Sequence, residues 1–176
     1  MYNDVLEGAK VLLRPITLED TGLIVNWRNN PLVRKNFIFR QDFTNEMHTK
    51  WFQEKVCTGD VVQYIIVDKA TKRPIGSIYF RDIDRVNESA EYGIFIGEDD
   101  LRGKGFGTEA AKLFLKFGFH TMHLHRIYLR VLAENEGAEK SYIKAGFRTE
   151  GIFHDMVKID GKYCDVVFMA CFANED

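Results

Sequence analysis

No apolar run in the sequence reaches the roughly eighteen residues that a membrane-spanning helix needs, so we expect no membrane association. The three cysteines are widely scattered and form no CxxC pair, which is typical of reduced thiols in a cytoplasmic protein. The formal net charge of −2 lacks the basic excess of a nucleic-acid binder, so we expect no nucleic-acid partner. The first residues also lack the basic-then-apolar order of a signal peptide, which again predicts a cytoplasmic location.

The composition is that of an ordinary globular protein, with 45% hydrophobic and 28% charged residues in a chain of 176. A chain of this length can bury one substantial hydrophobic core. No internal repeat, low-complexity tract or linker divides it. We therefore expect a single domain over residues 1–176.

Hydrophobic periodicity and turn residues predict the order β-α-α-β-β-β-α-β-α-β-β. The strands are predicted over residues 10–14, 61–68, 75–83, 90–96, 127–132, 147–159 and 162–172. The helices are predicted over residues 18–29, 44–56, 106–121 and 136–145. Asp160-Gly161 is a strong signal for a tight hairpin between the last two strands. This order indicates an α/β (α+β) fold whose mixed sheet is largely antiparallel.

A glycine-rich run stands directly before the most strongly periodic helix. Its residues are Arg102, Gly103, Lys104, Gly105, Phe106, Gly107 and Thr108. Glycine lets the backbone approach a ligand closely, and the helix start behind it offers unpaired N–H groups to an anion. The run therefore predicts a pyrophosphate cradle, although such a run can also be a turn without a ligand.

Two familiar phosphate motifs do not fit this run. A P-loop requires Gly-Lys-Ser/Thr, but Gly105 follows Lys104. A dinucleotide fingerprint from Gly105 matches at Gly107 and tolerates Ala110, yet it lacks the short βαβ unit and the acidic residue that would follow. A nucleotide-binding protein is therefore disfavoured.

A second motif opens the helix predicted over residues 136–145. Together the two motifs resemble the GNAT superfamily of acetyl-CoA-dependent N-acetyltransferases, because they occur in its order and on its elements. The loop Gln/Arg-x-x-Gly-x-Gly/Ala is matched by Arg102, Gly105 and Gly107. The second half of the superfamily pattern is matched by Asn135, Ala138, Tyr142, Gly146 and Phe147.

Within the superfamily, three segments resemble the ribosomal-protein N-terminal and spermidine acetyltransferase branch. They are Leu13-Arg14-Pro15, Ala90-Glu91-Tyr92 and Asp160-Gly161-Lys162-Tyr163. The segment from Trp27 to Arg34 instead resembles acetyltransferases of amino-sugar nucleotides. The resemblance implies an acceptor-side half over about residues 1–89 and an acetyl-CoA-binding half over about residues 90–172, and it leaves the acceptor open.

The resemblance implies how acetyl-CoA would be held and its thioester activated. The backbone N–H groups of Gly103–Thr108 would take the pyrophosphate, with added charge from Arg102 and Lys104. A backbone N–H near Phe95 or Ile96 would polarise the acetyl carbonyl.

Three side chains near the reacting atoms have both a catalytic and a structural interpretation. Tyr142 would serve as general acid, although a helical Tyr can simply pack its ring. Asn135 would bond the pantetheine arm, or cap the helix. Glu91 is a candidate general base or a solvated strand carboxylate; a water chain is the alternative base.

The resemblance implies that the segment beginning with Trp27, Arg28 and Asn29 shapes the acceptor side. His48 could also line the acceptor pocket, although an amphipathic helix explains it about as well. Carboxylates at positions 82, 84, 88 and 91 favour a cationic amine, whereas Arg28 and Arg34 favour a carboxylate or phosphate on the acceptor. We therefore expect a primary amine on a small molecule, such as an amino-sugar nucleotide, or a protein N-terminus, ahead of a polyamine such as spermidine.

Other interpretations remain open at this point. A non-catalytic acyl-CoA sensor would keep the cradle without turnover. His120, His123 and His125 do not share a helical face or a zinc pattern, so we expect no metal. The C-terminal hairpin could pair across a homodimer, which the sequence does not require.

Overall fold

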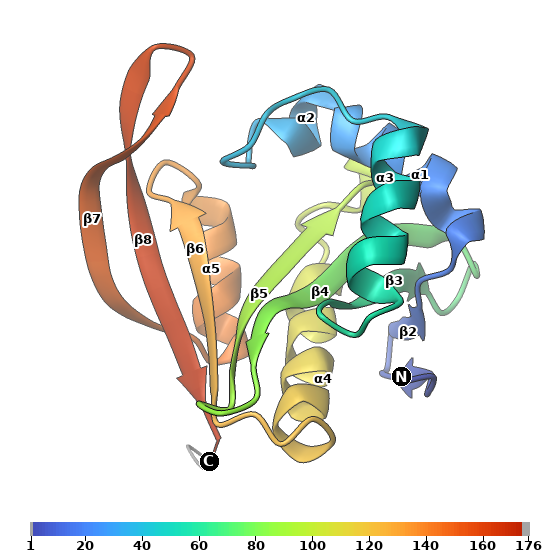
Figure 1. Ribbon diagram of the computed structural model, residues 1–176. Coiled ribbons are helices and arrows are strands. Elements are labelled where there is room, and N and C mark those ends of the chain that lie inside the picture. The colour runs from blue at the N-terminus through green and yellow to red at the C-terminus, as the bar shows by residue number, and fades with distance from the viewer. Residues whose placement is uncertain (1, 174–176) are drawn as a thin grey trace.

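The computed structural model describes residues 2–173 and contains one eight-stranded sheet in the order β1-β2-β3-β4-β5-β6-β8-β7 (Figure 1). Every pairing is antiparallel except that of β5 with β6, so the sheet is mixed as predicted. The strands are β1 (Leu6–Glu7), β2 (Val11–Pro15), β3 (Val62–Asp68), β4 (Pro74–Asp84), β5 (Ser89–Ile96), β6 (Arg126–Leu132), β7 (Arg148–Ile159) and β8 (Lys162–Phe172).

Helices cover both faces of this sheet. One face packs against α4 and α5 and the other against α1 and α3, in two separate clusters of buried side chains. The helices are α1 (Thr21–Asn29), α2 (Pro31–Arg34), α3 (Asn45–Trp51), α4 (Phe106–His120) and α5 (Glu136–Ala145). Within residues 2–173 no helix combines the length and apolar character needed to cross a membrane.

The main core forms where α4 lies on the sheet. Its periodic apolar residues bury Ala110, Phe114 and Phe117 on one side of the helix. The ring of Phe114 stacks on that of Phe80 in β4, with 4.2 Å between ring centroids. This packing fixes the N-terminus of α4, and hence the glycine-rich run, against the end of β5.

The predicted order of elements is confirmed, with differences at short or irregular segments. The helix predicted over 18–29 begins as a 3-10 turn, Leu18–Asp20, because the Asp20 carboxylate accepts the Thr17 N–H (2.9 Å) and pairs with Arg14 (2.7 Å). The helix predicted over 44–56 ends in a π-helical turn, Phe52–Val56. Sequence patterns missed β1 and α2, which are too short to show a period.

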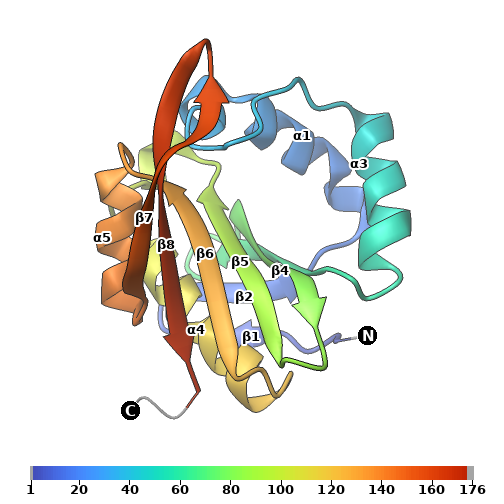
Figure 2. The same ribbon diagram turned by 60° about the vertical axis from the view of Figure 1, so that its left-hand side comes forward.

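The predicted tight turn between β7 and β8 is confirmed. Asp160 and Gly161 both have positive φ, 50° and 83°, as a two-residue hairpin turn requires. The tip of this hairpin stands clear of the sheet body (Figure 2). β7 is an edge strand, and its exposed side includes Ile152 and Phe153.

Candidate active site

The sheet opens between its two parallel strands. β5 pairs with β4 as far as Ile96, but with β6 only over Ser89–Glu91. Figure 1 shows the two strands together at their lower ends and apart at their upper ends. From residue 92 onward, one edge of β5 therefore has no strand partner.

Backbone direction identifies the groups on this open edge. The Gly97 N–H donates to the Ile75 carbonyl at 2.8 Å, toward β4. Because N–H direction alternates along a strand, the N–H of Phe95 also points toward β4, and those of Ile94 and Ile96 point into the opening. Of the two residues predicted to polarise a carbonyl, Ile96 is therefore the one with an available N–H.

A cavity of about 560 Å³ occupies this opening. The diverging parts of β5 and β6, residues 92–96 and 129–132, line opposite sides of it. The start of α4, one side of α5, the segment that follows α2, and individual residues of α1 and β4 also contribute to the lining.

The glycine-rich run lines one end of the cavity. Gly103 and Gly105 have φ of 72° and 86°, and no heavy atom lies within the contact range of an added Cβ at either position. The first bond of α4 runs from the Glu109 N–H to the Gly105 carbonyl (3.1 Å), so the N–H groups before Glu109 have no partner within the helix. This geometry fits an anion that approaches the backbone closely.

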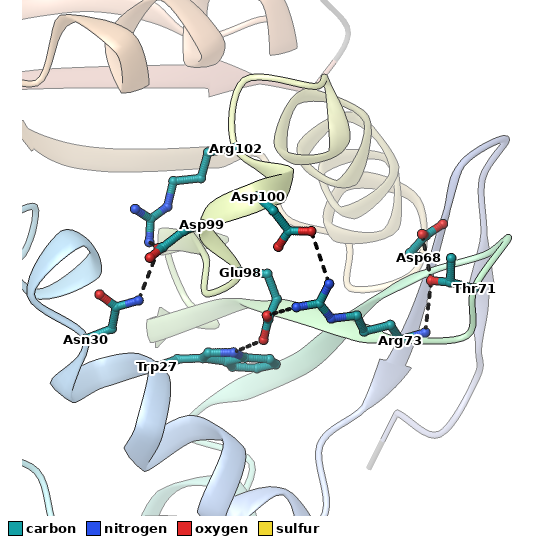
Figure 3. Close-up of polar contacts among 9 residues, drawn as sticks. All are labelled: Trp27, Asn30, Asp68, Thr71, Arg73, Glu98, Asp99, Asp100 and Arg102. Carbon is teal, nitrogen blue, oxygen red and sulfur yellow. Dashed lines mark hydrogen bonds and ion pairs between the residues drawn. The ribbon is translucent and has the colours of Figure 1, made fainter.

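The side chains of the glycine-rich run lie mostly outside the cavity. Arg102 lines the cavity, but its guanidinium pairs with Asp99 at 2.7 Å and its Nε donates to the Ile96 carbonyl at 3.2 Å (Figure 3). Lys104 is exposed outside the lining, and the Phe106 ring packs against the main core. Of these three side chains, only that of Arg102 lies at the cavity.

A hydrogen bond joins the two helices that border the cavity. The hydroxyls of Thr108 in α4 and Ser141 in α5 lie 2.8 Å apart, and both residues line the cavity. Asn135 caps α5, because its side-chain oxygen accepts the Ala138 N–H at 3.3 Å. The capping role that the sequence left open for Asn135 is therefore present, and the residue also faces the cavity.

Tyr142 faces the cavity from α5. Its ring makes edge contacts with Tyr92 and Phe147, at centroid distances of 6.0 and 5.9 Å. Burial, with a smaller contribution from Tyr79, raises the pKa of Tyr142 above its ordinary value of 10.0. The phenol therefore stays protonated at neutral pH, which is the form that a general acid needs.

Glu91 is held by two arginines. Its carboxylate, with a side chain only 6% exposed, accepts hydrogen bonds from Arg81 (3.0 and 3.3 Å) and Arg130 (3.0 and 3.1 Å). Burial alone would raise the pKa of Glu91, but the bonds from Arg130 and Arg81 outweigh it and hold this pKa below the ordinary value. Both features disfavour the predicted general-base role, because a doubly paired carboxylate of low pKa accepts a proton poorly.

Among the predicted acceptor-side residues, Arg28 reaches the cavity. Its guanidinium lies over the Phe37 ring, 3.7 Å from the centroid, and Phe37 contacts Phe95 at 5.6 Å. Burial, together with the like charge of Arg81, lowers the pKa of Arg28. No carboxylate of residues 2–173 pairs with it, so a half-buried cation faces the cavity without an anionic partner.

The other three residues predicted for the acceptor side do not line this cavity. Trp27 is 4% exposed and its indole N–H bonds Glu98. Asn29 fastens the backbone of Phe43 through two hydrogen bonds of 2.8 and 2.9 Å. His48 is 1% exposed, bonds the Thr21 hydroxyl at 2.9 Å, and lies outside the lining.

Sequence reasoning missed several lining residues, among them Phe37, Tyr79, Arg81 and Arg130. For Tyr79 the sequence offers one signal, namely a glycine, Gly93, at the position that pairs with it across the strands. A Cβ at Gly93 would meet the Tyr79 ring at 2.3 Å, so only glycine leaves room for the ring. Arg81 lies opposite Glu91 in the same hairpin register, but locating it requires the exact register.

Comparison with known proteins agrees with this geometry. Residues 10–148 match the family model of the acetyltransferase (GNAT) domain, and the chain belongs to this family. The resemblance stated from the two motifs is thereby confirmed.

Two relatives cover nearly the whole chain. The spermidine N(1)-acetyltransferase of Escherichia coli K12 is 30% identical over 94% of this chain and 87% of its own length. The spermidine N-acetyltransferase of Vibrio cholerae, solved in complex with CoA and spermine, superposes with a TM-score of 0.87 at 27% identity, over 94% of this chain and 96% of that one. A dodecameric structure of the Vibrio cholerae enzyme superposes with a TM-score of 0.80 at 27% identity, over 94% and 95% of the two chains.

The chain is thus an acetyl-CoA:amine N-acetyltransferase, with acetyl-CoA as its acetyl donor. The residues that line the cavity fit this donor. The positive-φ glycines leave room that a Cβ would fill, and the open edge of β5 offers unpaired backbone groups to an amide-bearing arm. No group of three or more potential metal ligands occurs among residues 2–173.

Substitution of Gly107 tests the cradle without straining the backbone. A Cβ there would make ordinary contacts with Ile96 and Ile94, at 3.8 and 4.0 Å, inside the cavity. Gly107→Val should raise the KM for acetyl-CoA at least about tenfold, because the side chain fills donor space, while the melting temperature changes little. Gly22→Val, on the open side of α1, is the matched control; equal KM values for the two variants would contradict the cradle.

Glu91 supports a prediction about pH and stability. Because its folded pKa is depressed, its contribution is present above its unfolded pKa of 4.5 and is lost as pH falls through the folded value. Glu91→Gln should lower the free energy of unfolding by about 1–3 kcal/mol at pH 7, since two arginines lose their anion. Urea unfolding should show that the difference in free energy of unfolding between wild type and Glu91→Gln narrows below pH 4.5. A difference that does not change with pH would contradict the ion-pair account. Glu88→Gln, at an exposed position, is the control.

Proposed function

We propose that the chain transfers the acetyl group of acetyl-CoA to the primary amine of a small anionic molecule, such as an amino-sugar nucleotide, or to a protein N-terminus. The observation that carries the reaction is the open edge of β5, which faces the same cavity as Tyr142 and the glycine cradle. A direct transfer within one complex suits this arrangement, because donor and acceptor reach one cavity from opposite sides.

Bound acetyl-CoA supplies an acetyl thioester that is already activated for attack by an amine. The Ile96 N–H, directed into the opening, would donate to the thioester carbonyl oxygen and stabilise the charge that develops there. The Tyr142 hydroxyl, kept protonated by burial, would give its proton to the departing sulfur.

The acceptor must lose a proton from an amine whose pKa is about 10. Glu91 is committed to Arg81 and Arg130, so we assign it a positioning role for these two cations. Water in the open cavity would take the proton from the amine.

Charge in the cavity supports an anionic acceptor. Every charged side chain of the lining is basic except Glu91, which is already paired. Arg28 is a half-buried cation with no anionic partner among residues 2–173, and guanidinium binds carboxylate and phosphate groups through paired hydrogen bonds. A polyamine would bring further positive charge to this lining.

Spermidine is the second candidate, and the two relatives that act on it favour it. Carboxylates from another copy of the chain or from outside the lining would have to balance its charge. A panel of spermidine, N-terminal peptides and amino-sugar nucleotides, assayed by release of free thiol from acetyl-CoA, separates the candidates.

Tyr142→Phe removes the hydroxyl and keeps the ring. It should lower kcat by about a hundredfold, because the departing thiolate loses its proton donor, with little change in acetyl-CoA affinity. Tyr163→Phe, on the exposed hairpin, is the matched control. Wild-type turnover in Tyr142→Phe would return Tyr142 to a packing role, and absence of thiol release from the wild type with every acceptor would support the sensor alternative.

Arg28→Ala tests the acceptor class. With an anionic acceptor, its KM should rise at least about tenfold, because a charge-assisted hydrogen bond is lost, while the KM for acetyl-CoA stays unchanged. Arg28→Lys keeps the charge without the planar guanidinium, so its KM for the acceptor should lie between those of the wild type and Arg28→Ala. Preference of the wild type for spermidine, unaffected by Arg28→Ala, would overturn the anionic assignment.

A further inference from the structure

Three consecutive carboxylates precede the cradle. Glu98, Asp99 and Asp100 form an acidic turn that ends close to Gly103 in the chain. Bound acetyl-CoA would place an anionic pyrophosphate at the cradle, and like charges at short range disfavour each other. The position of the acidic turn should therefore affect how well the donor binds.

Two arginines pair with the whole acidic turn (Figure 3). Arg73, directly before β4, contacts Glu98 with one guanidinium nitrogen and Asp100 with the other, the latter at 3.2 Å. Arg102 pairs with Asp99 at 2.7 Å. Each carboxylate of the turn is thus engaged by a cation.

Helix α1 and the residue that ends it, Asn30, also hold this turn. The Trp27 indole N–H donates to Glu98 at 2.8 Å, and the Asn30 side chain donates to Asp99 at 3.1 Å (Figure 3). The Trp27 ring lies so close to Gly97 that a Cβ there would meet it at 2.2 Å. The buried indole therefore fixes the chain just where β5 ends and the acidic turn begins.

A fixed turn presents Arg73 to the carboxylates. The Thr71 hydroxyl accepts the Arg73 N–H at 3.4 Å and donates to Asp68 at 2.7 Å, and the Asp68 N–H bonds the Arg73 carbonyl at 2.9 Å. The Arg73 side chain itself is 46% exposed, and ion pairs at this exposure add little to folding stability. Its effect on the donor site can therefore be measured apart from folding.

We propose that Arg73 and Trp27 are positioning residues for acetyl-CoA, which neutralise the acidic turn and hold it away from the cradle. This inference rests on the proposed function only in taking the cradle as the donor's pyrophosphate site. It gives a role in donor binding to Trp27, which the sequence placed on the acceptor side.

Calorimetric titration of acetyl-CoA tests this proposal without any acceptor. Arg73→Ala should raise the Kd for acetyl-CoA about tenfold at low salt, because two carboxylates beside the cradle lose their cation. The difference from wild type should shrink at high salt, where exposed charges are screened. Adding Glu98→Gln and Asp100→Asn to Arg73→Ala should restore affinity, and Arg73→Lys should stay near wild type.

Two further variants complete the test. Trp27→Phe removes the indole N–H and keeps an aromatic ring on Gly97, so it should weaken acetyl-CoA binding by a smaller factor than Arg73→Ala does. Trp51→Phe is its control. Arg85→Ala removes the same charge from an exposed position and should leave the Kd unchanged.

The outcomes separate this proposal from the proposed function. Equal effects of Arg73→Ala and Arg85→Ala, an effect of Arg73→Ala that persists at high salt, or no recovery on neutralising the turn would overturn the positioning role. Failure of the wild type itself to bind acetyl-CoA would count against the donor site. An error in the acceptor alone would leave all these binding results unchanged.

Discussion

The separation of two parallel strands is the constraint on which the rest of the site depends. β5 keeps its pairing with β4, and β6 keeps its pairing with β8 over its full length, so each half of the sheet remains intact while the seam between them opens. Opening leaves backbone groups of β5 without partners, which is unfavourable unless a ligand or water bonds them. The cavity, the available Ile96 N–H and the facing Tyr142 all follow from this divergence.

The features that were predicted well from the sequence are local ones. The cradle needs glycine at positive φ followed by a helix start, and both are visible in a short run. The motif that begins at Asn135 and opens α5, and the Asp160-Gly161 turn, likewise depend on residues that are close together in the sequence. The fold followed because these signals agree with the periodicity of the elements around them.

Only one of the four residues predicted for the acceptor side lines the cavity, for a geometric reason. Trp27, Arg28 and Asn29 are consecutive residues on α1, and neighbours on a helix point about 100° apart, so they cannot all face one cavity. Trp27 points into the core, Asn29 bonds the backbone of Phe43 in the loop that follows, and Arg28 lines the cavity. Glu91 shows the same limit, because its two arginine partners come from different strands and only the three-dimensional register brings them together.

The segment of residues 36–39 lines the cavity from outside the sheet. It is flanked by two ion pairs, Arg34 with Asp42 and Arg40 with Asp160 of the β7–β8 turn, and Phe39 within it is largely exposed. Residues here carry no part of the main core and no part of the cradle, so substitutions can accumulate at small cost to folding or donor binding. If this loop and Arg28 contact the acceptor as proposed, evolution can exchange one amine for another by changing them, while the donor side of the cavity stays the same.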